Sequence, residues 1–150
     1  MEPISRRTLM TLLPMTILAA ARADAQTGVV VFKDPGCGCC TKWVDLLRHE
    51  GFSVTVNETR DIGSAKQRFN VPPSLQSCHT AIVNNQYVVE GHVPIADVRR
   101  LLKNRPAIVG VAVPGMPIGS PGMEVEGARP QAYQVIAFDR QGKTSVFSSH

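Results

Sequence analysis

Three cysteines stand at the point where a β-rich run gives way to a helical period. Residues Val29–Phe32 are apolar and mostly β-branched, and Lys33–Gly36 then ends the run with turn residues. Cys37–Cys40 follows, and from Cys40 apolar residues recur at helical spacing, at Val44 and Leu47. This pattern predicts a strand that leads into a helix, with the cysteines at the helix N-terminus.

The later segments continue this alternation and predict the fold class. The expected elements are a strand over 52–57, a short helix over 62–69 with Asp61 as its cap, strands at 81–83 and 87–89 around Asn84-Asn85-Gln86, and a helix after Pro94. The order β-α-β-α-β-β-α predicts an α/β, thioredoxin-like core, in which helices flank a central mixed sheet. The rival is the ferredoxin-like order β-α-β-β-α-β, which also places a cysteine pair before its first helix. The additional helix over 62–69 favours the thioredoxin-like fold.

The C-terminal third has a different composition. Val113–Met123 is rich in Pro and Gly and shows no period, which predicts an ordered loop. Residues 133–138 and 144–147 then predict two strands joined through Arg140-Gln141-Gly142. We therefore expect a Pro/Gly-rich loop and a C-terminal β-hairpin as extensions of a single domain.

The first 25 residues have the three parts of an export signal. Arg6 and Arg7 precede an apolar run over Leu9–Ala21, and Ala23-Asp24-Ala25 supplies a small-x-small cleavage pattern. The arginine pair resembles a twin-arginine signal, although a general secretory signal with a basic start fits as well. We expect cleavage after about Ala25, a periplasmic location and one domain over 26–150.

Composition excludes several classes of function. The chain has 150 residues with 16 Lys and Arg against 12 Asp and Glu, no five-residue run of like charge and only eight aromatic residues. These features argue against nucleic-acid binding. After the N-terminus no apolar run reaches the roughly 18 residues that a membrane span needs. Four cysteines are too few for a disulfide-built scaffold, but they suffice for one reactive or metal-binding site.

The cysteine turn carries the strongest chemical signal. Cys37 and Cys40 have C-x-x-C spacing, and the free N–H groups and dipole of a helix N-terminus favour thiolates. A third thiol at Cys39 would disturb an ordinary dithiol redox pair, whereas three thiolates on one turn suit a soft cation such as Cu(I). A redox pair formed by Cys37 and Cys40, and a structural disulfide, remain as alternatives.

Further soft or nitrogen donors are spread along the chain. Cys78 opens the third expected strand, which in a thioredoxin-like fold starts beside the first helix N-terminus, so it could supply a fourth sulfur. His79 could reach the same place or point away, since adjacent strand residues alternate faces. His92 lies between a strand and a helix and is a candidate ligand, especially for Cu(II). Met116 and Met123 offer thioethers that select Cu(I), although packing alone also explains them.

Four motifs in this order resemble the CopG-type bacterial copper-resistance proteins, over about residues 29–147. They are Cys37-Gly38-Cys39-Cys40, Ser77-Cys78-His79-Thr80, Glu90-Gly91-His92-Val93-Pro94 and the Val113–Glu124 loop. The resemblance implies a thioredoxin-like fold, a periplasmic location and copper bound by Cys37, Cys39, Cys40 and Cys78. It also implies a role in the redox handling of copper.

The sequence thus predicts a periplasmic copper-binding protein that acts in copper tolerance. Its four cysteines would hold Cu(I), as one ion or as a small copper–thiolate cluster, and copper could be coupled to thiol oxidation, with Cu(II) as the second state. Expected partners are copper ions and other periplasmic copper-handling proteins. Two alternatives stay open: a thiol–disulfide oxidoreductase that uses Cys37 and Cys40, and an exported structural domain with two disulfides.

Overall fold

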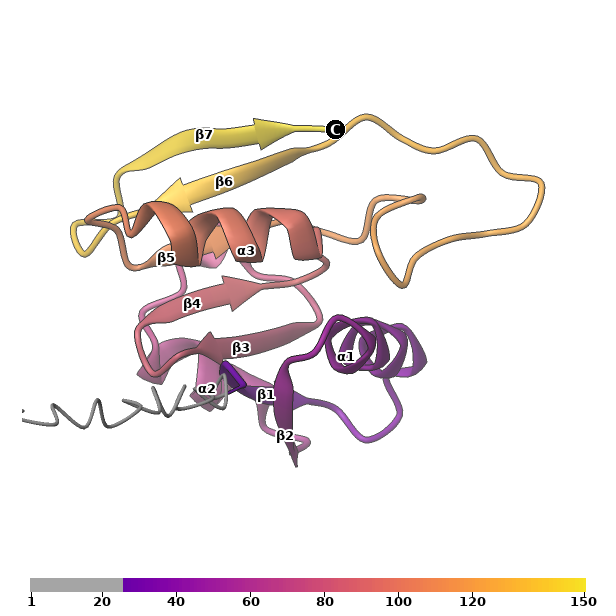
Figure 1. The fold of residues 1–150 in the computed structure, drawn as a ribbon, viewed down its shortest axis with the longest axis horizontal. Helices are drawn as coiled ribbons and strands as arrows, with labels where there is room; N and C mark the ends of the chain where they lie inside the picture. The colour runs from indigo at the N-terminus through magenta and orange to yellow at the C-terminus, as the bar shows by residue number, and fades with distance from the viewer. Residues whose placement is uncertain (1–25) are drawn as a thin grey trace, which may run out of the picture.

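A single mixed sheet of seven strands organises the molecule, in the order β2-β1-β3-β4-β5-β6-β7 (Figure 1). The structure, a computed structural model, describes residues 26–150. The predicted export signal lies outside these residues. The elements are β1 (Gly28–Lys33), α1 (Gly38–His49), β2 (Ser53–Glu58), α2 (Ile62–Arg68), the 3-10 helix η1 (Pro73–Leu75), β3 (His79–Val83), β4 (Tyr87–Glu90), α3 (Ile95–Asn104), β5 (Gly110–Ala112), β6 (Gln134–Phe138) and β7 (Thr144–Ser149).

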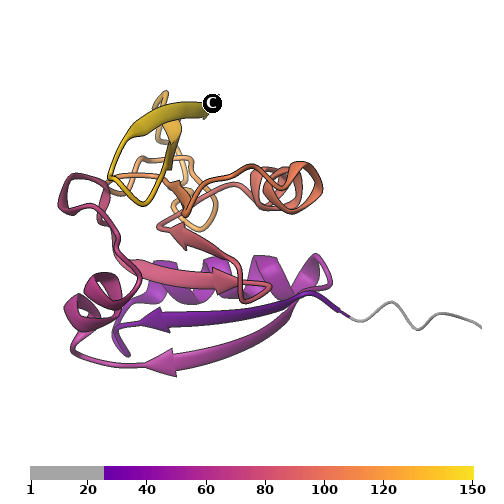
Figure 2. The ribbon, with the colours of Figure 1, turned by 90° about the vertical axis from the view of Figure 1, so that its left-hand side faces the viewer.

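The first four strands confirm the thioredoxin-like prediction. β1 pairs with β2 in parallel and with β3 in antiparallel, and β3 pairs with β4 in antiparallel. The ferredoxin-like alternative is excluded, because its split β-α-β unit places another strand between the two that here are direct neighbours. Figure 2 shows α2 and α3 on opposite sides of the sheet.

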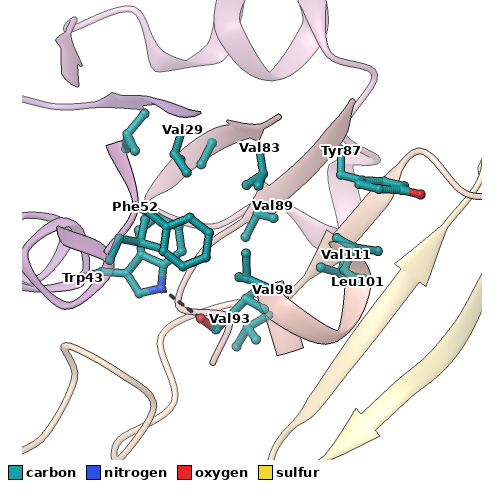
Figure 3. Packing of buried hydrophobic residues seen from close by; sticks show 14 of the residues in the cluster. Val29, Trp43, Phe52, Val83, Tyr87, Val89, Val93, Val98, Leu101 and Val111 are labelled. Carbon is teal, nitrogen blue, oxygen red and sulfur yellow. Dashed lines mark hydrogen bonds between the residues drawn. The ribbon is translucent and has the colours of Figure 1, made fainter. Parts of the chain in front are cut away.

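Two apolar clusters fill the two faces of the sheet. The larger contains side chains of α1 and α3, among them Trp43 and Leu101, and the smaller lies under η1 around Leu75 and Phe138. Trp43 is fully buried, and its indole Nε1–H donates to the carbonyl oxygen of Val93 at 2.9 Å (Figure 3). This bond ties α1 to the segment between β4 and α3, and it satisfies a buried donor.

The C-terminal extension has the predicted loop and hairpin, together with one strand that the pattern did not indicate. β5 runs parallel to β4 and joins it to the β6–β7 hairpin. The short apolar sequence Gly110–Ala112 has too few residues to show a period, and η1 is equally short. Figure 1 shows the segment between β5 and β6 as a long orange loop on the side of the sheet where α1 lies. In residues 26–150 we find no helix long and apolar enough to cross a membrane.

Gly110 allows β5 to approach β4 closely, which gives a direct test of this extension. A Cβ at this position would overlap the carbonyl oxygen of Val88, whereas a Cβ at Gly28 would meet nothing within 4 Å. We expect Gly110→Ala to lower the free energy of unfolding by about 1–3 kcal/mol, as overpacking does. Gly28→Ala, the matched control at the start of β1, should change it little. Urea unfolding followed by circular dichroism measures both, and equal stability of the two variants would contradict the β4–β5 pairing.

Candidate metal centre

The cysteine turn is built by the chain that leaves β1. The Asp34 carboxylate accepts from the N–H of Gly36 at 2.7 Å, and the Asp34 carbonyl accepts from the N–H of Cys37 at 3.1 Å. Cys37 occupies the N-cap position of α1 without a side-chain capping bond, so the cysteines lie at the helix N-terminus, as predicted. Cys40 is fully buried and Cys39 is half-buried, so the turn exposes only part of its sulfur to solvent.

Two of the turn cysteines are joined in the structure. Cys37 and Cys40 form a disulfide with their Cα atoms 5.4 Å apart, while Cys39 and Cys78 are free thiols. The Sγ of Cys39 lies 3.5 Å from the Sγ of Cys37. The molecule is therefore seen with one dithiol pair oxidised and two thiols beside it.

Cys78 meets this turn because of the strand register. β1 ends at Lys33 and β3 begins at His79, and these two residues are paired across the antiparallel ladder. Cys78, which precedes β3, therefore lies at the same edge of the sheet as the turn that follows β1. The Sγ atoms of Cys37, Cys39, Cys40 and Cys78 all lie within 4.8 Å of one another.

His92 presents a nitrogen to the Cys78 sulfur in a fixed orientation. Its Nδ1 lies 2.8 Å from the carbonyl oxygen of Pro121, and its Nε2 lies 3.0 Å from the Sγ of Cys78. A carbonyl oxygen only accepts, so Nδ1 carries the hydrogen and Nε2 keeps its lone pair toward the sulfur. Metal-ligating histidines are held in the same way, by a hydrogen bond from the nitrogen that does not bind the metal.

His79 also turns toward the cysteines instead of away from them. Its ring is fully buried between Trp43, at 4.5 Å between centroids, and His92, at 5.1 Å. Its Nδ1 lies 3.4 Å from the Sγ of Cys78, and its Nε2 has no hydrogen-bond partner. Cys78, His79 and His92 thus form a second group of donors within 4.8 Å, which shares one sulfur with the first.

Burial favours the neutral form of both imidazoles. It lowers the pKa of His92, and it lowers the pKa of His79 well below its ordinary value, because a charged His79 would be buried beside the His92 ring and near the Lys66 ammonium. A neutral imidazole retains the lone pair that a metal requires. The burial of the two histidines therefore favours the form that ligation needs.

The Cys78 thiol holds its proton firmly. Burial, and then the charge of the neighbouring Cys39, raise the pKa of the Cys78 thiol to about 11. A metal that binds this sulfur must displace the proton, so binding at Cys78 strengthens as the pH rises toward that value.

The Pro/Gly-rich loop closes over the N-terminus of α1. Gly122 adopts a positive φ of 86°, and a Cβ there would lie 2.9 Å from the carbonyl oxygen of Cys39 and 3.2 Å from the nitrogen of Trp43. Glycine is thus needed both for the turn and for the close approach. The same stretch supplies the Pro121 carbonyl to His92, a backbone acceptor that no side-chain pattern in the sequence could reveal.

The two methionines of this loop differ in exposure. Met116 is 53% exposed and follows Gly115, whose carbonyl accepts a hydrogen bond from the Ser77 hydroxyl. Met123 is half-buried and directly follows Gly122. Both thioethers therefore belong to a loop that contacts the segments carrying the cysteines.

Comparisons with known proteins agree with this arrangement. A family model described as "Protein of unknown function, DUF411" matches residues 75–123. Two solved structures titled "Copper resistance protein copG", Form 2 and Form 1, match with TM-scores of 0.78 and 0.76 at 44% and 46% identity. They cover 84% and 82% of this chain, and 99% and 96% of their own chains. No curated protein matches the sequence.

The chain belongs to the CopG family of copper resistance proteins. The resemblance found in the sequence is therefore confirmed, and the CopG neighbours together with the four clustered cysteines point to copper-related metal binding. The remaining histidines of this CopG protein lie elsewhere: His49 is exposed on α1, and His150 pairs with Asp97 at 2.7 Å.

The high pKa of the Cys78 thiol gives a prediction for the metal-free CopG protein. With Cys37 and Cys40 in a disulfide, iodoacetamide at pH 8.5 can modify only Cys39 and Cys78. Only the thiolate reacts, so a pKa of about 11 should slow modification of Cys78. The expected slowing is roughly 100-fold relative to the same residue in urea-unfolded protein. Peptide mass spectrometry over time measures both rates, and similar rates in folded and unfolded protein would contradict the buried environment.

Proposed function

We propose that this CopG protein binds Cu(I) through Cys37, Cys39, Cys40 and Cys78 and acts in copper tolerance in the periplasm. The observation that carries the proposal is the meeting of four sulfurs within 4.8 Å, from two segments that are 38 residues apart. A fold that needed these cysteines only for packing would not have to bring all four to one point. Four thiolates in one place form a site for a soft cation.

The chemistry of the donors favours copper over harder ions. Both groups of clustered donors in residues 26–150 consist of cysteine and histidine alone, without a carboxylate. Thiolates select Cu(I), whereas Mg²⁺ and Ca²⁺ prefer oxygen ligands. Zn²⁺ also accepts four sulfurs, and we expect reduced protein to take Cu(I) in preference to Zn²⁺. Four sulfurs can bridge more than one Cu(I), and we propose a small copper–thiolate cluster.

The histidines and methionines extend this site. A ring nitrogen of His92 and one of His79 each lie close to the Cys78 sulfur, so the two residues would supply imidazole to a copper ion that shares this sulfur. Imidazole also suits Cu(II). We place Met116 and Met123 as additional thioether donors of the covering loop.

The disulfide supports a coupling of copper to thiol redox chemistry. When Cys37 and Cys40 are both thiolates, they can give two electrons to two Cu(II) ions, which yields two Cu(I) ions and the Cys37–Cys40 disulfide. The structure holds the oxidised end of this couple. Oxidation also removes two of the four thiolates, so the same step weakens the soft site and would release copper to another periplasmic copper-handling protein.

A second candidate function is a thiol–disulfide oxidoreductase that uses Cys37 and Cys40. The disulfide at the N-terminus of α1 favours it, because this is where a thioredoxin-like fold places a redox pair. An oxidoreductase of this kind uses only Cys37 and Cys40 and does not require the Cys39 thiol. The effect of removing Cys39 therefore separates the two candidates.

We expect Cys39→Ser to lower the amount of copper bound by reduced protein, while the Cys37–Cys40 disulfide still forms. Anaerobic loading with Cu(I), removal of excess metal and elemental analysis should give more than one copper per wild-type chain and clearly less in Cys39→Ser. Thr41→Ser, at an exposed position in the same first turn of α1, keeps the hydroxyl that donates to the Cys37 carbonyl; it is the matched control and should load like the wild type. Unchanged copper content in Cys39→Ser would favour the oxidoreductase, and a bound Zn²⁺ that Cu(I) cannot displace would contradict the copper site.

A further inference from the structure

A buried ion pair lies on the face of the sheet against which α2 packs. Glu90, at the end of β4, is fully buried, and its Oε1 contacts the Nζ of Lys66 on α2, which is also buried. Thr80 pairs with Glu90 in the ladder, so both side chains point to the α2 face, whereas the adjacent His79 points to the α1 face. The ion pair therefore takes no direct part in the metal centre.

The Glu90 carboxylate reaches the backbone beside Cys78. Its Oε1 accepts from the N–H of Ser77 at 2.6 Å, and its Oε2 accepts from the Thr80 hydroxyl at 2.6 Å. A buried ion pair contributes little to stability on balance, because desolvation of the two charges offsets their attraction. The bond to Ser77, in contrast, fixes the position of the backbone N–H of the residue that directly precedes Cys78.

The Ser77 side chain also has close contacts, with the covering loop and with the residue that follows β4. Its hydroxyl donates to the carbonyl oxygen of Gly115 in the covering loop. A Cβ on Gly91 would lie 2.7 Å from the Cβ and Oγ of Ser77 and 2.7 Å from the carbonyl oxygen of Val113. Ser77 thus fits between the end of β4 and the loop, and the next residue in the chain is Cys78.

We propose that Glu90 is a positioning residue for the metal centre, because its carboxylate holds the N–H of Ser77 and so sets the Cys78 sulfur against the three cysteines of the turn. The inference rests on the proposed function where it concerns copper, but its geometric part concerns Cys78 alone. Lys66 balances the carboxylate charge, which lets an ionised group stay buried at this point.

Two double variants separate positioning from charge balance. Lys66→Met with Glu90→Gln removes both charges and keeps an oxygen that can accept from Ser77. Lys66→Met with Glu90→Met also removes both charges at similar volume, but leaves Ser77 without this acceptor. Replacement of a buried ion pair by apolar side chains is often tolerated, so we expect both proteins to fold.

The first readout is Cu(I) affinity, measured by competition with bathocuproine disulfonate under anaerobic conditions. We expect the Gln variant to bind like the wild type and the Met variant to bind at least about tenfold more weakly, as the loss of a well-placed ligand would produce. In a Cys78→Ser background the two variants should bind equally, because the sulfur being positioned is gone. Equal affinity of the two variants with Cys78 present, or an equal difference without it, would overturn the proposal.

The second readout needs no copper. In metal-free protein with the disulfide intact, iodoacetamide should modify Cys78 faster in the Met variant than in the Gln variant. If the wild type binds no Cu(I) but this difference appears, the proposed function fails and the positioning role stands. If the Gln variant folds while the Met variant does not, and Lys66→Met with Glu90→Leu does not either, the Ser77 bond is structural and the proposal is wrong.

Discussion

The pairing of Lys33 on β1 with His79 on β3 is the constraint on which the candidate metal centre depends. Two antiparallel neighbours bring the end of one strand and the start of the other to the same edge of the sheet. The cysteine turn follows the first and Cys78 precedes the second, so four sulfurs meet although the chain between them forms α1, β2, α2 and η1. A slip of this register by one residue would reverse the faces of His79 and its neighbours and move Cys78 away from the turn.

Around this edge of the sheet, contacts with the backbone position the His92 and Trp43 side chains and the covering loop. The Pro121 carbonyl orients His92, the Val93 carbonyl receives the indole of Trp43, and Gly122 lets the loop lie against α1. Burial then sets the electrostatics, since it lowers the pKa of both histidines and raises the pKa of the Cys78 thiol. The thiols therefore lie among groups whose positions are set by backbone contacts.

Much of this arrangement could be predicted from the sequence, because periodicity and turn residues report on neighbours along the chain. The strand before Cys37, the helix after it and the hairpin around Asn84-Asn85 follow from such local signals, and the order of elements gives the thioredoxin-like core. β5 is too short to show a period, and it forms because β4 and β6 lie on either side of it. The Lys66–Glu90 ion pair joins residues 24 positions apart, and no local pattern in the sequence indicates such a contact. The alternation of side chains along β3 left open to which face His79 points.

The claim at the centre of this account is that the four cysteines form one Cu(I) site, and copper K-edge X-ray absorption tests it most directly. Reduced protein, loaded anaerobically with Cu(I), should show the edge of monovalent copper, a nearest shell dominated by sulfur and a further shell from a second copper ion. The account predicts this sulfur shell because the Sγ atoms of the four cysteines lie within 4.8 Å of one another. A nearest shell of nitrogen and oxygen, with little or no sulfur, would contradict it.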